Sequence, residues 1–111
     1  EENTAQLEPP MVTAYIMAVD DSARILALAL AEKIRDAMPS WQIMVDTSGG
    51  RFKSQFKKAD KKGARLALIL GEEELLKQTI SIKDLRGNQA QQSVSEADIV
   101  ESMKTYLNLS E

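Results

Sequence analysis

Two stretches of the chain are almost continuously apolar and short enough to be strands. They are residues 12–19, VTAYIMAV, and residues 65–70, RLALIL. An uninterrupted apolar run of this length is typical of a strand that is covered on both sides. We therefore predict two central strands here. Weaker patterns predict further strands over 41–45, 79–85 and 90–94, and the alternation in 79–85 gives that strand one wetter face.

A first helix is expected between the strands at 12–19 and 41–45. It should span residues 22–37, because Asp20, Asp21 and Ser22 supply N-cap chemistry and carboxylates favour the positive end of a helix. Pro39 and Ser40 should stop it. Its expected apolar face consists of Ile25, Leu26, Leu28, Ala29, Leu30 and Ile34.

The remaining pattern completes an α/β arrangement. Residues 72–76 should form a short helical turn, and Ser95 should cap a last helix with Asp98 at the capping-box position. The apolar side of that helix is Ile99, Val100, Met103 and Leu107. Residues 1–10 have the polar, proline-ended composition of a linker, which leaves 11–111 as the domain. The order β-α-β-α-β-β-β-α predicts a mixed sheet with helices on both faces and its first strands parallel.

Charge is distributed very unevenly along the chain. Residues 49–65 carry seven basic side chains and one acid, Asp60, for a net charge of +6. The basic residues are Arg51, Lys53, Lys57, Lys58, Lys61, Lys62 and Arg65. The whole chain is −3, so everything outside this segment sums to −9. Such a segment is typical of a surface that binds a polyanion, and among polyanions it favours nucleic acid.

The same basic segment has helical periodicity over residues 51–62. Its apolar and small residues recur at spacings of four, three and four, so they share one side of the helix, which should face inward: Phe52, Phe56, Ala59 and Gly63. Lys57, Lys58 and Lys61 fall on the opposite side at about 100° per residue. We therefore predict a helix that packs one side into the core and presents cations on the other.

Composition narrows the function classes. At 111 residues the chain is long enough for one domain with a single core. No apolar run approaches the roughly 20 residues needed to cross a bilayer, and no secretory signal is visible. Cysteine and histidine are both absent, which excludes disulfides, thiolate zinc sites and the usual proton shuttles. We infer no self-contained enzyme and no membrane partner, expect a cytoplasmic protein, and, since the chain begins at Glu1, expect a piece of a longer one.

An acidic pair offers a catalytic alternative. Asp20 and Asp21 at the end of the first strand resemble the pair that holds magnesium in response-regulator receivers. Those domains also need a phospho-accepting aspartate at the end of the third strand, where this chain has Leu70-Gly71-Glu72. Asp46 lies one strand too early. Helix capping is therefore the favoured interpretation of the pair.

Two other motifs carry weaker signals. Glu72-Glu73-Glu74 has no histidine partner for acid–base or metal chemistry, so a solvated helical turn is the simpler interpretation. Gly49-Gly50 precedes a helix as anion-binding loops do, but the lysine and hydroxyl of a P-loop are missing. We predict no catalytic residue and no metal site in these residues.

Three motifs together carry a family resemblance. They are GGRFKSQFKKADKKGA over 49–64, LILGEEE over 68–74 and IKDLR over 82–86. In this order and spacing they resemble the C-terminal anticodon-binding domain of bacterial histidyl-tRNA synthetases, and the resemblance covers residues 11–107. Ser48, Arg51 and Ser54 stand where that family more often has glycine, asparagine and lysine.

The resemblance implies a fold and a set of contacts. The fold is a three-layer α/β domain with a five-stranded mixed sheet flanked by three helices. An acid after the third strand and a base on the next recognise anticodon bases in related synthetases, and these positions match Glu74 and Lys83. The other implied tRNA-binding residues are Arg51, Lys53, Gln55, Lys57 and Lys58. The lysines would hold the backbone of the stem-loop. An ion pair between Glu74 and Lys83 is the structural alternative.

The resemblance also implies a parent enzyme. Its members activate histidine with ATP and magnesium in a separate catalytic domain, act on histidine tRNA and work as homodimers. On this interpretation, the present residues hold no cofactor of their own. A tRNA-binding module of a non-catalytic synthetase paralogue or regulator stays open as the alternative.

Overall fold

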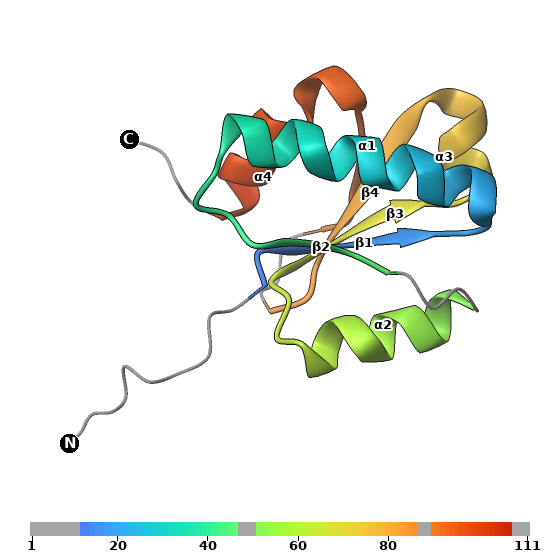
Figure 1. The fold of residues 1–111 in the computed structure, drawn as a ribbon, viewed down its shortest axis with the longest axis horizontal. Coiled ribbons are helices and arrows are strands. Elements are labelled where there is room, and N and C mark those ends of the chain that lie inside the picture. Colours follow the sequence, from blue (N-terminus) through green and yellow to red (C-terminus); the bar gives the residue numbers. More distant parts are fainter. Residues whose placement is uncertain (1–11, 47–50, 87–89, 108–111) are drawn as a thin grey trace.

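The described residues form one five-stranded sheet with helices on both faces (Figure 1). The structure is a computed structural model that describes residues 12–46, 51–86 and 90–107. Its elements are β1 (Ala14–Ala18), α1 (Asp21–Ala37), β2 (Ile43–Val45), α2 (Phe52–Lys61), β3 (Leu66–Leu70), α3 (Glu72–Lys77), β4 (Thr79–Asp84), β5 (Gln92–Ser95), the 3-10 turn η2 (Glu96–Asp98) and α4 (Ile99–Tyr106). The predicted α/β fold is confirmed, while the predicted linker over 1–10 lies outside the described residues.

The strand order is β2-β1-β3-β4-β5. β1 is parallel to β2 and to β3, as expected where helices cross over between strands, and the remaining pairs are antiparallel. Every residue of β1 and β3 is buried, which confirms that both central strands are covered on their two faces. Each observed strand begins and ends within two residues of its prediction.

Alternate residues of the central strands serve two separate cores. Ile16 and Leu68 belong to the larger core, under α1 and α4. Tyr15, Met17 and Ile69 belong to the smaller core, under α2. Figure 1 shows α1 and α4 on one side of the sheet and α2 alone on the other. The predicted cationic helix is therefore the only helix on its face among the described residues.

Helix α1 begins as predicted but buries a different set of residues. Asp20 caps it, with Oδ1 accepting a hydrogen bond from the Ala23 N–H at 2.9 Å. The side facing the sheet is formed by Ala23, Ala27, Leu30, Ala31 and Ile34. Ile25, Leu26 and Leu28 are 69%, 52% and 49% exposed, and Ala29 is exposed as well, so placing these four on the buried side was wrong. Three alanines let the helix approach the sheet closely, and at 100° per residue Ile25 lies opposite them.

Helix α2 packs as its periodicity predicts. Ala59 is buried, and Phe52 and Phe56 are half-buried against the smaller core. Gly63 follows the C-cap of the helix, and its φ of 75° lies in the left-handed region that glycine adopts without steric cost. The N–H of Gly63 and that of Ala64 return to carbonyl groups of the last turn, at 3.0 Å each.

The last helix differs from its prediction at its start. Ser95 makes no side-chain cap and instead donates to Asp98 Oδ2 at 3.1 Å. The predicted capping box is therefore wrong, and the turn η2 precedes α4. The predicted apolar side is confirmed, since Ile99 and Met103 are buried and the other two residues pack against the same core.

Candidate nucleic-acid interface

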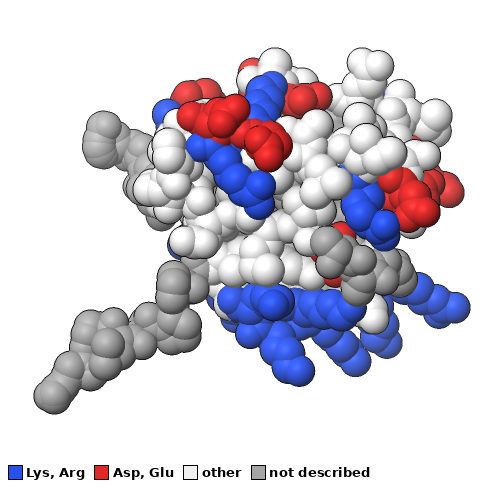
Figure 2. All heavy atoms as spheres, viewed as in Figure 1, with Lys and Arg blue, Asp and Glu red and all other residues white. Residues whose placement is uncertain are grey.

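The outer side of α2 is a cationic ridge, which we define as Arg51, Lys53, Lys57, Lys58, Lys61 and Lys62. All are exposed except Lys58, which is half-buried. Figure 2 shows basic side chains gathered over α2, while acidic side chains lie mainly elsewhere on this view. Within the described part of the chain, Arg51, Lys53, Lys57 and Lys61 form no ion pair. Their charges are therefore available to an anionic partner.

One predicted member of the basic segment points elsewhere. Arg65 pairs with the buried Asp84, Nε to Oδ1 at 3.5 Å, and donates from Nη2 to the carbonyl oxygen of Tyr106 at 3.2 Å. The acid of the segment is also compensated, because Asp60 pairs with Arg86 at 3.0 Å. Arg65 therefore joins α4 to the sheet and is not part of the ridge.

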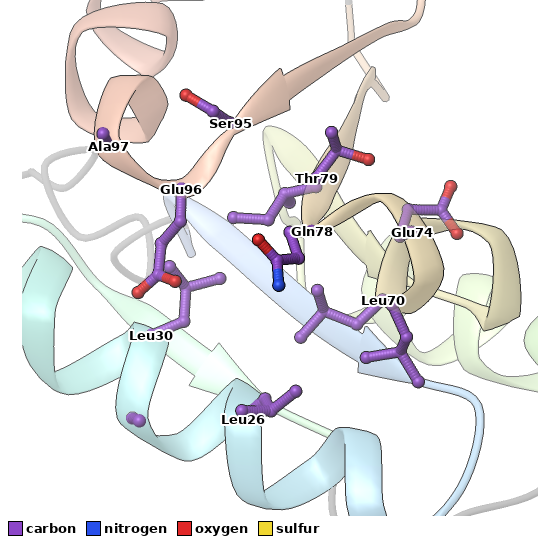
Figure 3. A pocket seen from close by; sticks show the side chains of 12 residues that line it. Leu26, Leu30, Leu70, Glu74, Gln78, Thr79, Ser95, Glu96 and Ala97 are labelled. Carbon is purple, nitrogen blue, oxygen red and sulfur yellow. The ribbon is translucent and has the colours of Figure 1, made fainter.

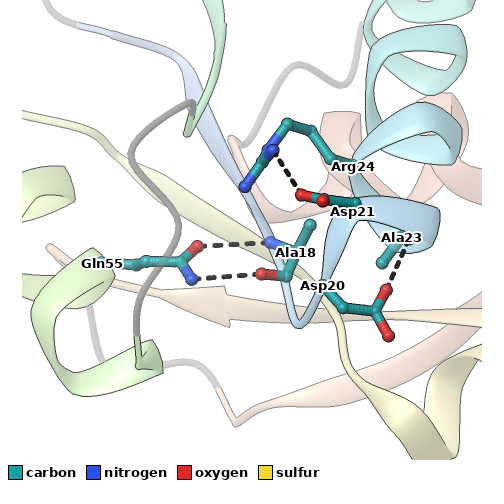
Figure 4. A network of polar contacts seen from close by, with 6 residues as sticks. All are labelled: Ala18, Asp20, Asp21, Ala23, Arg24 and Gln55. Carbon is teal, nitrogen blue, oxygen red and sulfur yellow. Dashed lines mark hydrogen bonds and ion pairs between the residues drawn. The ribbon is translucent and has the colours of Figure 1, made fainter.

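Gln55 lies on the buried side of α2 and not on the ridge. Its Oε1 accepts from the Ala18 N–H at 3.2 Å, and its Nε2 donates to the Ala18 carbonyl oxygen at 3.1 Å (Figure 4). The β1–β2 pairing ends at Ile16, so this amide takes the place of a strand neighbour for Ala18. A side chain that is 0% exposed does not support the predicted contact with tRNA. Its role in the structure is to tie α2 to the sheet.

A second buried polar contact lies in the same core. The hydroxyl of Tyr15 donates to Asp46 Oδ1 at 2.6 Å, and both residues are buried. Burial, together with the hydrogen bond to Asp46 and its negative charge, raises the pKa of Tyr15 well above its ordinary value. The phenol therefore stays protonated and holds the end of β2 against β1.

Part of the sheet face beside α2 belongs to β4 and β5. Lys83 pairs with Ala67 and Ser81 with Ile69 in the β3–β4 register, and Ala67 and Ile69 face the α2 side. Lys83 and Ser81 therefore share that face with the cationic helix. Lys83 is exposed, whereas Ser81 is 2% exposed. Ser93 lies opposite Ser81 on β5, and their hydroxyl oxygens are 3.2 Å apart.

Glu74 is held in place by two hydrogen bonds. Its Oε1 accepts from the Gly71 N–H at 3.0 Å, and its Oε2 accepts from the Ser81 hydroxyl at 2.5 Å. A Cβ at Gly71 would lie 2.8 Å from Oε1 and 3.3 Å from the ring of Phe52, so a larger residue there would displace the Glu74 carboxylate from this position. No ion pair joins Glu74 to Lys83 within the described residues. Gly71 and Glu74 have the spacing of a capping box, a signal that could have predicted the first contact.

The other acidic motifs have structural partners. Asp20 caps α1, and Asp21 pairs with Arg24 at 2.8 Å (Figure 4). Glu73 pairs with Lys77 at 2.9 Å, and this contact lowers the pKa of Glu73. Within residues 12–46, 51–86 and 90–107, no group of three or more acidic, histidine or cysteine side chains could hold a metal ion. The receiver interpretation has no support in this geometry.

The opposite face of the sheet carries a cavity of about 600 Å³ with a mixed apolar and polar lining (Figure 3). It lies between α1, α3 and the start of β4, and leucines from α1, β3 and α3 line much of it. Leu26 borders it, and Leu76 on α3 is 85% exposed. The domain therefore has a cationic face and a partly apolar face, separated by the sheet.

This five-stranded mixed sheet with helices on both faces is the fold of a known domain family. Residues 13–106 match the family model described as "Anticodon binding domain", and the chain belongs to that family. No helix in the described ranges is both long and apolar enough to cross a membrane.

Two similar relatives belong to a narrower group than the family model, because they are histidine–tRNA ligases. Histidine–tRNA ligase of Legionella pneumophila strain Philadelphia 1 is 53% identical over 93 residues, which are 84% of this chain and 22% of that protein. The corresponding protein of strain Lens is 52% identical over the same length. The chain thus spans about a fifth of the length of these relatives and matches only their anticodon-binding part. The resemblance found in the sequence motifs is confirmed.

Solved structures of synthetases have the same fold as this chain. Histidyl-tRNA synthetase from Nostoc sp. PCC 7120 superposes with a TM-score of 0.77 and 27% identity, over 89% of this chain and 23% of that one. The RNA binding domain of threonyl-tRNA synthetase from Cryptosporidium parvum Iowa II superposes with a TM-score of 0.72 at 10% identity, over 85% of this chain and 23% of that one. The second likeness shows the shared fold alone.

Proposed function

We propose that this chain is the part of a histidine–tRNA ligase that binds the anticodon stem-loop of histidine tRNA. The observation that carries the proposal is the cationic ridge on α2, in a domain of the anticodon-binding family whose relatives are histidine–tRNA ligases. The whole chain is acidic at −3, so binding to a polyanion has to be concentrated on such a local surface.

The ridge and the neighbouring sheet face have different roles in this proposal. Arg51, Lys53, Lys57 and Lys58 contact phosphates, which gives affinity and register but no sequence choice. Glu74 and Lys83 lie beyond the ridge and recognise bases that leave the stack of the loop, because carboxylates accept from base amines and cations donate to base carbonyls. Phe52 and Phe56 support the helix from the core side.

The parent enzyme completes the proposal. A separate catalytic domain uses ATP and magnesium to activate histidine, and the enzyme works as a cytoplasmic homodimer. The proposal assigns no catalytic step to the residues of this chain. Their contribution is to position the tRNA for aminoacylation.

The test titrates the 111-residue protein against histidine tRNA and against a copy with a substituted anticodon, across a salt series. We expect the slope of log Kobs against log salt to be a few units, since each neutralised phosphate contributes roughly −0.7 to −0.9. Lys57→Glu should weaken both RNAs alike. Glu74→Ala or Lys83→Ala should mainly reduce the difference between them. Equal affinity of the parent protein for both RNAs would contradict anticodon recognition.

Lys33→Glu is the matched control. It makes the same change of charge on α1, on the opposite side of the sheet, where Lys33 contacts Glu96 at 3.9 Å. We expect Lys33→Glu to leave RNA affinity close to that of the parent protein. If it weakens binding as much as Lys57→Glu, net charge alone governs affinity and the ridge has no special role.

A further inference from the structure

Three side chains form a hydrogen-bonded chain from the helix α3 to the exposed edge of the sheet. Glu74 is half-buried, Ser81 is 2% exposed and Ser93 is exposed. Glu74 Oε2 and the Ser81 hydroxyl are 2.5 Å apart, and the Ser81 and Ser93 hydroxyl oxygens are 3.2 Å apart. The chain lies on the sheet face that also carries Lys83.

The carboxylate determines the direction of every hydrogen bond in this chain. A carboxylate only accepts, so the single hydroxyl proton of Ser81 goes to Glu74. Ser81 then has no proton for Ser93, and the contact between the two hydroxyls is a hydrogen bond only if Ser93 donates. The proton of Ser93 therefore points inward. Its free lone pair points outward, because each hydroxyl oxygen has one proton and two acceptor sites.

We propose that Glu74, acting through Ser81, makes Ser93 a fixed acceptor that selects a hydrogen-bond donor of the bound RNA. The donor is an exocyclic amine of an unstacked base or a ribose 2′-hydroxyl, the two kinds of donor that single-stranded RNA offers at such a surface. Ser93 is a contact residue in this scheme, and Ser81 is a positioning residue. The inference rests on the proposed function and adds the chemical group that this part of the interface recognises.

Glu74→Gln should reverse the polarity. The glutamine Oε1 can keep the hydrogen bond from the Gly71 N–H, while its Nε2 takes the position of Oε2 and donates to Ser81. Ser81 then gives its proton to Ser93, whose own proton turns outward. The same side-chain shape would thus present a donor where the parent protein presents an acceptor. Glu74→Gln therefore changes the direction of the hydrogen bonds while keeping the shape of the side chain.

The experiment uses the 111-residue protein and the anticodon stem-loop of histidine tRNA at low salt. One set of RNAs lacks a single amine, with inosine replacing each loop guanosine in turn, and another carries a single 2′-O-methyl group. We expect one such change to weaken binding to the parent protein about threefold to tenfold, the size of one hydrogen bond. The same change should have no effect on binding to Ser93→Ala, and Ser93→Thr should restore the effect. Glu74→Gln should bind the changed RNA at least as well as the unchanged one.

Two negative results have different meanings. If Lys57→Glu abolishes binding but Ser93→Ala keeps the full sensitivity to donor removal, the polarity inference is overturned and the proposed function stands. If Lys57→Glu binds histidine tRNA as the parent protein does, the proposed function fails and the inference falls with it. Unfolding midpoints of the variants check that they are folded, and Ser93 is exposed, so we expect its substitution to leave the fold intact.

Discussion

Helices α1 and α2 cover opposite faces of the same sheet but obtain their contact surfaces in different ways. Helix α2 buries the residues that its sequence pattern selects, because lysines on one side contrast sharply with phenylalanine and alanine on the other. Helix α1 is apolar on several sides, and it buries three alanines while Ile25 and Leu28 remain exposed. Strong charge contrast therefore identifies a buried side, whereas apolarity alone does not.

The difference arises from how closely each helix approaches the sheet. A helix close to a sheet needs small side chains at the line of contact, and its large side chains then fall to the flanks or outward. Scattered exposed apolar residues are normal in folded proteins. On α1, however, Leu26 also borders the cavity of Figure 3, so this helix presents apolar surface in addition to its core side.

The largest effect on stability should come from Ile34 of α1, in contrast to Ile25 of the same helix. Ile34→Ala should lower the free energy of unfolding by about 2–5 kcal/mol, because Ile34 is fully buried and the change leaves a cavity. Ile25→Ala should change it by no more than ~0.5 kcal/mol, since Ile25 is 69% exposed. Urea unfolding of both variants measures the contrast. Equal losses would show that the outer side of α1 is buried in solution.

Gln55 tests the buried side of α2. Gln55→Met removes both hydrogen bonds to the Ala18 backbone while filling a similar volume. We expect a loss of about 2–4 kcal/mol, because a buried N–H and a buried C=O lose their partner. Gln55→Glu keeps a side-chain oxygen that can accept from the Ala18 N–H, but it loses the N–H group that donates to the Ala18 carbonyl oxygen. A stability of Gln55→Met equal to that of the parent protein would contradict the structural role of this residue.

Tyr15 gives a pH-dependent prediction for the same core. Tyr15→Phe should cost about 1–3 kcal/mol, because it removes the hydroxyl that donates to the buried Asp46. The raised pKa of Tyr15 means that its contribution is complete below the ordinary tyrosine pKa of about 10 and is lost as pH rises beyond it. The stability of the parent protein should therefore fall more steeply than that of Tyr15→Phe above about pH 10. Parallel pH profiles would exclude this coupling.

The smallest effect on stability should come from the outer side of α2. Lys57→Gln removes an exposed charge with no ion-pair partner among the described residues, so the free energy of unfolding should change by less than ~0.5 kcal/mol. The salt slope of RNA binding should nevertheless decrease by roughly 0.7 to 0.9, the contribution of one phosphate. A large loss of stability without any change in the slope would make Lys57 a structural residue.

Much of the candidate site was accessible from sequence. The spacing of Phe52, Phe56 and Ala59 predicted the inner side of α2, and the positions of Lys53 and Lys57 on its outer side followed from the same periodicity. Gln55 was assigned to the interface by resemblance, although it lies on the buried side. The periodicity of α2 could have shown this, because Gln55 precedes Phe56 by one residue and Ala59 by four.

The sequence by itself determined the order and kind of the elements, the parallel start of the sheet and the concentration of cations on one helix. These features depend on local spacing, which a single stretch of residues contains. Only the tertiary structure decided that Arg65 pairs with Asp84, that α1 packs on its alanines, and that Ser81 and Ser93 connect Glu74 to the surface. Those features depend on strand register and on the approach of one layer to another, which join residues far apart in the chain.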